Sequence, residues 1–589
     1  MSQDDPHFLF DGQSSVRGKK WTFRANDESK IEDLVRAGYT QTVSRLLSGR
    51  DVMPEDSEHF LNPTLRDYLP DPSSLVDMDK AAKRIVDAIE NSESVTVFAD
   101  YDVDGGTSAA QLVRWGRALG AEFSIYVPDR IKEGYGPSVD AFHLIKQRGA
   151  DLVITVDCGA AAHDALFAAA EIDLPIIVID HHLMVGDIPP AHALVNPNRP
   201  DDESGLGHLA AAGVTFVALV ALNREARKRG IENLPDLKRF LDLTALGTIC
   251  DVVPLKGLNR AFVTQGLKVL DSYPNPGLEM LGRVAKSSGK ASTYHGGFIL
   301  GPRINAGGRI GQADMGAQLL ASDDMQKIEE YAFELDRINT QRKALQERVL
   351  VEAIEKAERL PADHSVTIVA MDGWHAGIIG IVAGRLKDRF DRPAIVIGIN
   401  EDGVGKGSGR SISGVNLGEA IQKAKESGIL EAGGGHEMAA GLTINPEKLE
   451  EFQSFIEEML AQDVEEARKK QSYKVDALLT PAAATPELIE QIEHVGPYGS
   501  NNPEPVFVFP DMRVSYAQRL NGGHVRCAFE DHAGIRVSGI AFRADENGIA
   551  DVLLSPNPPI MNIAGRLKQD TWNGRTKIDL QIADILVNA

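Results

Sequence analysis

Acidic side chains crowd one short segment, which reads Asp100-Tyr-Asp102-Val-Asp104-Gly105 and follows the apolar run at 94–99. Alternate residues at the end of a strand point the same way, so the three carboxylates are expected to face one site. Like charges held this close are strongly unfavourable unless cations neutralise them. A metal site is therefore favoured over a solvated acidic loop, and an EF-hand is excluded because no Glu stands at the twelfth position of such a loop.

Further acids and two histidines follow other apolar runs. Asp157 follows LVITV, the triplet Asp180-His181-His182 follows PIIVI, and Asp251 lies in CDVVP. Taken singly, such an Asp is usually a helix cap and such a His is usually structural. Their shared position after apolar runs predicts that they join the first acidic segment in one cluster.

The composition of this cluster favours particular metals and a particular reaction. Carboxylates with one or two imidazoles suit Mn²⁺ or Mg²⁺ better than Zn²⁺, and the imidazole favours Mn²⁺ of the two. Two such ions, about 3.5–4 Å apart, can activate a water, orient a phosphate and stabilise the attacking and leaving oxygens. These residues therefore predict the hydrolysis of phosphodiesters.

The elements that position these residues alternate between strands and helices. Short apolar runs at 94–99, 123–127, 151–156 and 175–179 are separated by helical patterns such as 106–119. This alternation predicts a parallel α/β sheet, in which ligands bind beyond the carboxyl ends of the strands. The acidic residues fall at that edge.

A long helix is expected to connect this part to the rest of the chain. Neither Gly nor Pro occurs between Gly316 and Pro361, and apolar residues recur there at helical spacing. With Ser322 and Asp323 as caps, the helix would span roughly 35 residues, or about 50 Å. A second α/β pattern follows it, and short strands from about residue 473 onward indicate a small antiparallel barrel.

Size, charge and cysteine content limit the class of protein. The 589 residues suggest roughly three to four domains, and 43% hydrophobic residues are typical of a globular chain. The net charge of −23 lowers the expectation of DNA binding without excluding it, since acidic outer faces can surround a basic channel. Three cysteines without a CxxC pair, no signal peptide and no membrane-length apolar run predict a cytoplasmic protein without membrane association.

The ordered motifs resemble those of a known superfamily. The chain is similar to the DHH phosphoesterases in four signature motifs, DYDVDGGTS, VDCG, DHH and CDVVP. Its later segments resemble those of the RecJ family of single-strand-specific 5′→3′ DNA exonucleases, namely GPRINAGGRIG, WHAGIIGIVAGRL, GSGRSISGVNL, GGGHEMAAGL and GPYGSNNPEPVF. The resemblance covers roughly residues 45–589, and the combination of motifs is far more specific than any one of them.

The resemblance implies an α/β protein with two α/β domains, DHH and DHHA1, joined by a long helix, plus a C-terminal β-barrel of the OB-fold. The implied activity is the release of mononucleotides from the 5′ end of single-stranded DNA, in repair and recombination. The alternatives are a phosphodiesterase of short oligonucleotides or cyclic dinucleotides and a catalytically silent scaffold of a replication complex. The expected parts are an N-terminal extension at 1–45, the DHH catalytic domain at 46–315, the connecting helix at 316–360, the DHHA1 domain at 361–465 and the OB-fold domain at 470–589.

The resemblance also implies which residues hold the two metal ions, Mn²⁺ or Mg²⁺. Carried over by motif position, it assigns metal binding to Asp102 and Asp104 and a bridge between both ions to Asp157. His181 and Asp251 complete the second site. These assignments are expectations for the structure.

Two further residues are expected to act in catalysis. Asp100 either binds a metal beside these ligands or supports one of them from behind, and His182 contacts the scissile phosphate or helps to protonate the leaving group. The division of labour between His181 and His182 stays open.

Substrate contacts are implied in segments that the bare sequence leaves ambiguous. Arg303, Asn305 and Arg309 either reach phosphates or lie solvated in a turn, and the resemblance places them along the path to the metals. In the glycine-rich segments of the second α/β domain, main-chain N–H groups can approach an anion. The residues expected there are His375, Arg410, Ser411, Gly433, Gly434, Gly435 and His436.

Cations and aromatic residues are interleaved in the C-terminal barrel. Such a barrel either holds single strands by charge and base stacking or buries its aromatics as an ordinary core. The resemblance favours binding of single-stranded DNA, and it implies a single-strand-binding protein and a RecQ-type helicase as partners of a monomer. The residues concerned are Arg519, His524, Arg526, Arg536, Arg543, Arg566, Lys568, Lys577, Tyr516, Phe529, Phe542 and Trp572.

Overall fold

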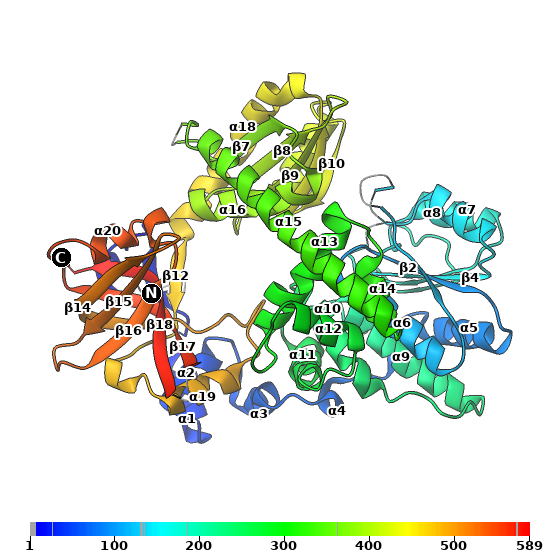
Figure 1. Cartoon of the computed structure of the whole chain (residues 1–589), viewed down its shortest axis with the longest axis horizontal. Helices are drawn as coiled ribbons and strands as arrows, with labels where there is room; N and C mark the ends of the chain where they lie inside the picture. The colour runs from blue at the N-terminus through cyan, green and yellow to red at the C-terminus, as the bar shows by residue number, and fades with distance from the viewer. Residues whose placement is uncertain are drawn as a thin grey trace. The chain divides into compact units, whose positions relative to one another are not determined.

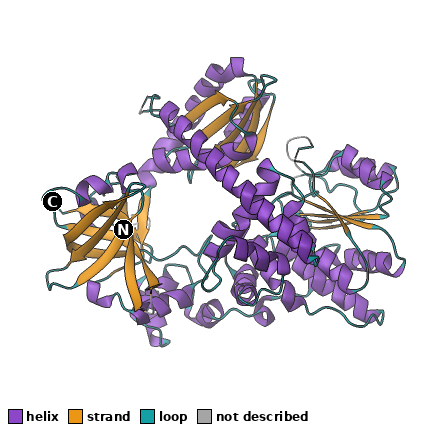
Figure 2. Cartoon of the chain, in the orientation of Figure 1, coloured by secondary structure: helices purple, strands orange, loops and turns teal. Residues whose placement is uncertain are grey.

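The computed structural model describes residues 8–25, 27–129, 133–134, 136–184, 186–361, 363–572 and 575–588. The chain folds into two compact units (Figures 1 and 2). The barrel unit comprises Met1–Pro70, Val252–Leu267 and Gln471–Ala589, and the two-sheet unit comprises Asp71–Asp251 and Lys268–Lys470. Within the described ranges, no helix combines the length and the apolar character needed to cross a lipid bilayer.

A five-stranded parallel sheet forms the first part of the two-sheet unit, in the order β3-β2-β4-β5-β6. Four of its strands match the apolar runs predicted from the sequence. Because β2, β4 and β5 are buried along their whole length, their sequences are continuously apolar rather than alternating. The strands are β3 (Ser124–Tyr126), β2 (Val95–Ala99), β4 (Leu152–Val156), β5 (Ile176–Ile179) and β6 (Ala193–Val195).

Three helices pack on one another beside this sheet: α6 (Val103–Ala118), α9 (Ala211–Lys228) and α10 (Leu241–Cys250). The contact between α6 and α10 is close because Gly247 has no side chain. A Cβ at Gly247 would lie 2.5 Å from Oγ1 of Thr107. This packing places the first turn of α6 beside the last turn of α10.

One long helix, α15 (Met325–Ala357), leads from the first part of this unit to the second (Figure 1). Its cap is Asp324, whose carboxylate accepts hydrogen bonds from main-chain N–H groups of the first turn. Ser322 and Asp323, the caps expected from the sequence, precede it. A separate helix, α14 (Met315–Ala321), ends before Ser322, so the connecting helix is shorter than the expected span of 316–360.

The second sheet of this unit is mixed, in the order β10-β11-β9-β8-β7. Its first two strands along the chain are parallel and are joined by α16 (Ala376–Phe390), and the later strands pair antiparallel. This is the second α/β region predicted from the sequence. The strands are β7 (Thr367–Asp372), β8 (Ala394–Ile399), β9 (Gly405–Arg410), β10 (Ala432–His436) and β11 (Ala439–Ile444).

The barrel unit contains the predicted C-terminal barrel. Its strands run in the order β14-β15-β16-β18-β17, and β17 pairs with β14 to close the barrel. Closure leaves the barrel sheet without free edges at these strands. The strands are β14 (Phe507–Leu520), β15 (His524–Glu530), β16 (Arg536–Ala541), β17 (Met561–Trp572) and β18 (Arg575–Val587).

N-terminal residues belong to the barrel unit rather than to a separate extension. β1 (Lys20–Phe23) pairs in parallel with β12 (Ser472–Val475), and Leu34 and Leu47 share an apolar core with the barrel. Arg260 anchors the inserted segment, because its buried guanidinium donates to three main-chain carbonyl oxygens of the same unit. The barrel unit is therefore assembled from three separate stretches of sequence.

Candidate metal centre

The acidic residues gather at the carboxyl ends of β2, β4 and β5. Asp100, Asp157 and Asp180 each follow one of these strands directly. Asp102 instead caps α6, where its carboxylate accepts from the N–H of Asp104 at 2.8 Å, and Asp104 lies in the first turn of the helix. The expected alternation along a strand is thus replaced by a helix N-terminus, whose partial positive charge also favours carboxylates.

Main-chain groups hold the carboxylate of Asp104 in place. Its two oxygens accept hydrogen bonds from the N–H groups of Ala211 and Ala212, at 2.7 and 2.8 Å, where α9 begins. Gly105, the next residue, has to be a glycine, because a Cβ there would lie 2.5 Å from the carbonyl oxygen of Asp100. The DG pair of the motif therefore combines a carboxylate held by two hydrogen bonds with a close approach of the main chain.

Two strained positions flank the centre. Asp157 has a φ of 60°, in the left-handed region, where non-glycine residues are uncommon. Asp251 caps the C-terminus of α10, and Val252 directly after it has a φ of 61°. Such backbone strain is concentrated at functional sites, where the surrounding structure stabilises it.

The ring of His181 points one nitrogen into the acidic cluster. Its Nδ1 lies 3.0 Å from the carbonyl oxygen of Leu209, so Nδ1 carries the hydrogen and Nε2 is left with a lone pair. Nε2 lies 3.2 Å from Asp157, 3.6 Å from Asp251 and 3.9 Å from Asp104. It is buried, and within the described chain it makes no hydrogen bond, as expected of an imidazole arranged to ligate a metal ion.

Three overlapping groups of side chains bring their ligand atoms within 4.8 Å of one another. Asp157 and His181 each belong to two of the groups, so a pair of neighbouring cation sites could share them. Oxygen and imidazole donors in this mixture suit Mn²⁺ or Mg²⁺. The groups are Asp100 with Asp102 and Asp157, Asp104 with His181 and Asp251, and Asp157 with His181 and His182.

Electrostatics in the cluster point to the same conclusion. Burial, followed by repulsion from Asp251, raises the pKa of Asp104 to about 7. Burial also raises the pKa of Asp157, with repulsion from Asp102 next in size, and burial and Asp102 raise the pKa of Asp251 to about 7. A divalent cation would offset both burial and repulsion, since its positive charge would neutralise the ionised carboxylates.

His182 has a different partner, Asp180. Its Nδ1 lies 2.7 Å from Oδ1 of Asp180, whose carboxylate also accepts the N–H of Ala160. Burial lowers the pKa of His182, but the hydrogen bond and charge of Asp180 outweigh it and raise this pKa to about 9. The side chain of His182 is 48% exposed, so its ring is accessible from outside the cluster. The role of Asp180 in orienting this ring was not predicted from the sequence.

The segment α13 (Gly301–Ile310) connects the metal centre to the second sheet. A Cβ at Gly308 would lie 2.8 Å from the carbonyl oxygen of Tyr101, within the acidic motif. Arg309 donates from Nη1 to the carbonyl oxygen of Gly377 at 3.0 Å, and His375 caps α16 by accepting the N–H of Gly377. These contacts place the predicted Arg309 and His375 together, between the two sheets.

The other two residues predicted in α13 are placed differently. Arg303 donates to Asp336 at 2.9 Å and to the carbonyl oxygen of Ile299 at 2.7 Å. Asn305 is half-buried. Their contact with a substrate stays a prediction.

Strand β9 presents a polar row on one face. Lys406, Ser408 and Arg410 alternate with three glycines, whose places on the opposite face are filled by apolar side chains such as Leu442. Ser408 accepts a hydrogen bond from Arg410, and a Cβ at Gly380 of α16 would touch both. Lys406 and Ser408 were missed in the sequence, although strand alternation through GKGSGR is a signal that indicates them.

The glycine-rich segment, expected from the sequence to be a loop, forms strand β10 and lies in the same sheet as this row. Gly434 pairs across the sheet with Gly441, and Gly441 pairs with Ser408. A Cβ at Gly434 would meet no atom within 4 Å, whereas at Gly435 it would lie 2.3 Å from the carbonyl oxygen of Ala439. The absence of a side chain at Gly434 thus has no packing reason among the described residues, which fits an approach by a ligand.

The remaining predicted residues of this region are also located. His436 at the end of β10 is exposed. Gly433 is closed in, since a Cβ there would lie 2.8 Å from Ile421. The hydroxyl of Ser411 is buried and donates to the carbonyl oxygen of Val415 at 2.7 Å, so its contact with an anion stays a prediction.

Known protein families match three stretches of the chain. Residues 94–248 match the DHH family, N-terminal domain, residues 363–462 match the DHHA1 domain, and residues 475–584 match the RecJ OB domain. The three stretches coincide with the parallel sheet, the mixed sheet and the barrel. The order of domains is the one implied by the motifs.

Similar proteins share most of the chain. The single-stranded-DNA-specific exonuclease RecJ of Bacillus subtilis (strain 168) is 36% identical over 577 residues, which are 97% of this chain and 71% of that protein. The crystal structure of RecJ in complex with Mn²⁺ from Thermus thermophilus is 27% identical, with a TM-score of 0.80, over 99% of this chain and 80% of that one. The same protein in complex with Mg²⁺ is 26% identical, with a TM-score of 0.74, over 97% and 78%. With these domains, this identity and this coverage, the chain belongs to the RecJ family of single-stranded-DNA-specific exonucleases.

Proposed function

We propose that this chain hydrolyses single-stranded DNA from its 5′ end and releases mononucleotides, with two divalent ions, Mn²⁺ or Mg²⁺, as cofactors. The observation that carries the proposal is the buried cluster in which Asp157 and His181 each belong to two groups of ligand atoms. Membership in the RecJ family supports the choice of substrate. The 5′→3′ direction rests on the resemblance of the motifs.

The chain's own residues would fix and complement the ions. When bound, two such ions supply Lewis acidity and a water activated at neutral pH. Asp157 is the ligand proposed to bridge them, and the hydrogen bond from His181 to Leu209 keeps Nε2 available as a donor. His182, protonated through Asp180, would contact the scissile phosphate or give a proton to the leaving oxygen.

The polar row on β9 and the glycines of β10 would hold the phosphates of the single-stranded DNA. Arg410 offers a guanidinium, Ser408 a hydroxyl and Gly434 an unobstructed main chain, and the strand pairing brings all three together. Arg309 and His375 lie between this surface and the metal centre. Single-stranded DNA could therefore bind to the second sheet while its end reaches the metal centre.

The barrel would bind the strand mainly through aromatic side chains. Tyr516 and Phe542 are each 48% exposed, so bases could stack on them, whereas Phe529 is buried in the barrel core. The side chain of Trp572 lies outside the described residues. Several expected cations form ion pairs within the barrel unit, which weakens their case as phosphate ligands. These pairs are Arg519 with Asp545, Arg536 with Glu530, Arg566 and Lys568 with Glu504, and Lys577 with Asp579.

The location, oligomeric state and protein partners are proposed from the resemblance to the family. We propose a cytoplasmic monomer that works with a single-strand-binding protein and a RecQ-type helicase. The activity of the relatives on DNA supports a location where chromosomal DNA is accessible.

The decisive experiment is digestion of single strands labelled at either end, in Mn²⁺, Mg²⁺ or chelator. We expect labelled mononucleotide to appear at once from the 5′ label and only late from the 3′ label, and no product in chelator. Early release from the 3′ label would contradict the direction, and undiminished release in chelator would contradict the metal centre.

The same assay separates the alternatives. Hydrolysis of cyclic dinucleotides or dinucleotides with intact long strands would favour the small-substrate phosphodiesterase. No hydrolysis with either metal would favour the silent scaffold. Against the scaffold stands the complete set of acidic and imidazole ligands around His181.

A further inference from the structure

A second charged pocket lies in the two-sheet unit, at the ends of α6 and α10 that are remote from the metal centre. α6 begins after its cap Asp102, and Arg114 and Arg117 near its end line the pocket. α10 ends at Asp251, and Leu243 in its first turn lines the pocket. At 1.5 Å per residue, the 16 residues of α6 separate the pocket from the metal centre by about 20 Å.

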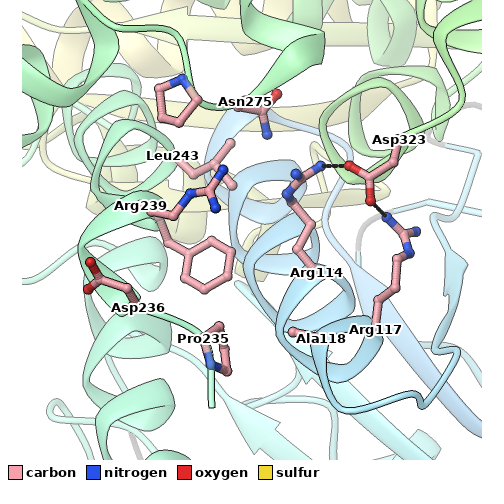
Figure 3. Close-up of a pocket in the computed structure, with 11 residues that line it drawn as sticks. Arg114, Arg117, Ala118, Pro235, Asp236, Arg239, Leu243, Asn275 and Asp323 are labelled. Carbon is pink, nitrogen blue, oxygen red and sulfur yellow. Dashed lines mark hydrogen bonds and ion pairs between the residues drawn. The ribbon is translucent and has the colours of Figure 1, made fainter. Parts of the chain in front are cut away.

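The pocket has a volume of about 480 Å³, within the range of roughly 300–1,000 Å³ that is typical of small-molecule sites. Its arginines come from two elements: Arg114 and Arg117 from α6, and Arg239 from the 3₁₀ turn η4 (Leu237–Phe240). Figure 3 shows Arg114 and Arg117 pointing toward Asp323 on one side, while Arg239 extends from the opposite wall. Guanidinium groups therefore approach the pocket from two sides.

The carboxylate of Asp323 already pairs with two of the three arginines that line the pocket. Oδ1 of Asp323 lies 2.8 Å from Nη1 of Arg114, and its Oδ2 lies 2.6 Å from Nη1 of Arg117. Each guanidinium also donates to a main-chain carbonyl oxygen at the end of α14, at 3.1 and 2.7 Å. Both arginines are thus held with donors directed at a bridging oxyanion.

Arg239 differs from these two arginines. Its side chain is exposed, and across the described ranges its guanidinium takes part in no ion pair. The pocket contains three guanidinium groups and two carboxylates, those of Asp236 and Asp323, in a chain whose net charge is −23. A local excess of positive charge on such a chain, beside a cavity, points to an anionic ligand.

We propose that this pocket binds a phosphomonoester dianion, held by Arg239 together with Arg114 and Arg117. A phosphate monoester offers three terminal oxygens, so it can accept from three guanidinium groups, whereas a carboxylate offers two. Phe240 and Pro235 also line the pocket, and their apolar side chains offer a surface against which a nucleoside could pack. Two sources share this chemistry, inorganic phosphate and a nucleoside 5′-monophosphate. The site does not depend on the nuclease activity proposed above.

The test is calorimetric titration of the full-length chain in chelator, with inorganic phosphate and with deoxyadenosine 5′-monophosphate. Arg239→Gln should weaken binding by at least about tenfold, the worth of a charge-assisted hydrogen bond. Asp323→Asn should tighten binding by roughly threefold or more, because it removes the internal competitor. Lys238→Gln is the matched control, since it removes the same charge one residue away from the pocket lining and should change nothing.

Each result decides for or against the pocket. Wild-type affinity in Arg239→Gln, equal weakening in Lys238→Gln, or no binding at millimolar ligand would overturn the proposal. Loss of the signal in Arg410→Gln with full retention in Arg239→Gln would overturn it too, because the anion would then bind the second sheet. If the pocket is supported, equal affinity for both ligands identifies phosphate as the source, and at least tenfold tighter binding of the nucleotide identifies the nucleotide.

Discussion

Asp157 and Val252 hold left-handed backbone conformations next to the cluster of carboxylates, at φ values of 60° and 61°. For a β-branched residue such as Val252 this conformation costs about 1–2 kcal/mol or more, and its side chain is 67% exposed, so burial does not repay the cost. The turn at Val252 follows directly on Asp251, whose carboxylate at the end of α10 lies 3.6 Å from Nε2 of His181. A strained backbone whose cost is not offset by burial is typical of functional sites rather than of positions that stabilise the fold.

Asp157→Asn tests the shared ligand without changing its size. We expect hydrolysis with Mn²⁺ to fall by more than about 10³-fold, because the bridge between two cation sites is lost. The variant should unfold at a higher temperature than the wild type in chelator, since burial and neighbouring acids disfavour the ionised carboxylate there and raise the pKa of Asp157.

The matched control for this variant is Asp164→Asn, which neutralises an exposed acid in the next helix along the chain. It should leave the rate unchanged and should not raise the unfolding temperature, because Asp164 lies in the first turn of α8, where a carboxylate is favoured. A folded Asp157→Asn variant that retained near-normal turnover would disprove the bridging role.

The sequence predicts the cluster of acidic residues, but it does not predict the groups that hold these residues in place. Acids at strand ends, such as Asp100 and Asp157, could be found because each follows an apolar run, and the end of a strand in a parallel sheet is where ligands bind. Ser408 and Asp180 could not be weighed in the same way. The role of Ser408 depends on the pairing of neighbouring strands, which brings Gly434 and Gly441 alongside it. The role of Asp180 depends on its contact with the ring of His182.

Among the elements, β10 offers a direct test of the proposed phosphate grip. Gly434→Ala adds a methyl group in open space, so folding should be unaffected, while the affinity for single strands falls about tenfold if a phosphate approaches the main chain there. Gly435→Ala should instead destabilise the chain by about 1–3 kcal/mol, because its Cβ would collide with Ala439.

Gly384→Ala in α16 is the control, since a Cβ there also meets no atom within 4 Å. Strand affinity by fluorescence anisotropy and unfolding by denaturant give the two readouts. Unchanged affinity in Gly434→Ala would remove this glycine from the proposed binding surface.

The elements themselves were predictable where local pattern decides them. Buried strands such as β4 are continuous apolar runs, and the gap without Gly or Pro indicated the long helix. Its start was not predictable, because Asp323 and Asp324 are equally good caps by type. The arginines at the end of α6 engage Asp323, which leaves Asp324 to cap α15. Only the tertiary structure could decide between them.

Helix α10 carries a buried acid that links stability to pH. Burial raises the pKa of Asp242 to about 7 from an ordinary value of 3.8, against the lowering effect of the Leu243 N–H. Since the folded state holds this proton more tightly than the unfolded state, the stabilisation is complete below about pH 3.8 and is lost as the pH rises through 7.

Asp242→Asn should therefore gain stability relative to the wild type, by on the order of 2 kcal/mol, between pH 5 and pH 8. Denaturant unfolding at both pH values measures this difference. Glu232→Gln, which changes an exposed acid, should show no such gain. A constant difference between Asp242→Asn and the wild type would mean that Asp242 does not titrate in this range.

At the scale of the whole molecule, sequence order and compact units do not coincide. The barrel unit takes residues from both ends of the chain and from the insertion after Asp251. Deleting the chain after Gln471 would remove β12 from β1 and uncover Leu34, Leu47 and the fully buried Trp21. Such a truncation is expected to aggregate, so the role of the barrel has to be tested by surface substitutions.

Tyr516→Ala together with Phe542→Ala removes the exposed aromatics while leaving the barrel core intact. Stacking of a base on an aromatic ring contributes about 1–3 kcal/mol, so affinity for long single strands should fall at least tenfold. Hydrolysis of dinucleotides should persist, because the three groups of candidate metal ligands found among the described residues all lie in the two-sheet unit. The loss should remain at high salt, since stacking does not release counterions as phosphate contacts do.

Ile560→Ala, which trims another exposed apolar side chain of the barrel unit, is the control for this double variant. Long-strand affinity equal to that of the wild type would show that the barrel binds strands elsewhere or serves assembly, and a parallel loss of dinucleotide hydrolysis would show that binding and catalysis are not separable.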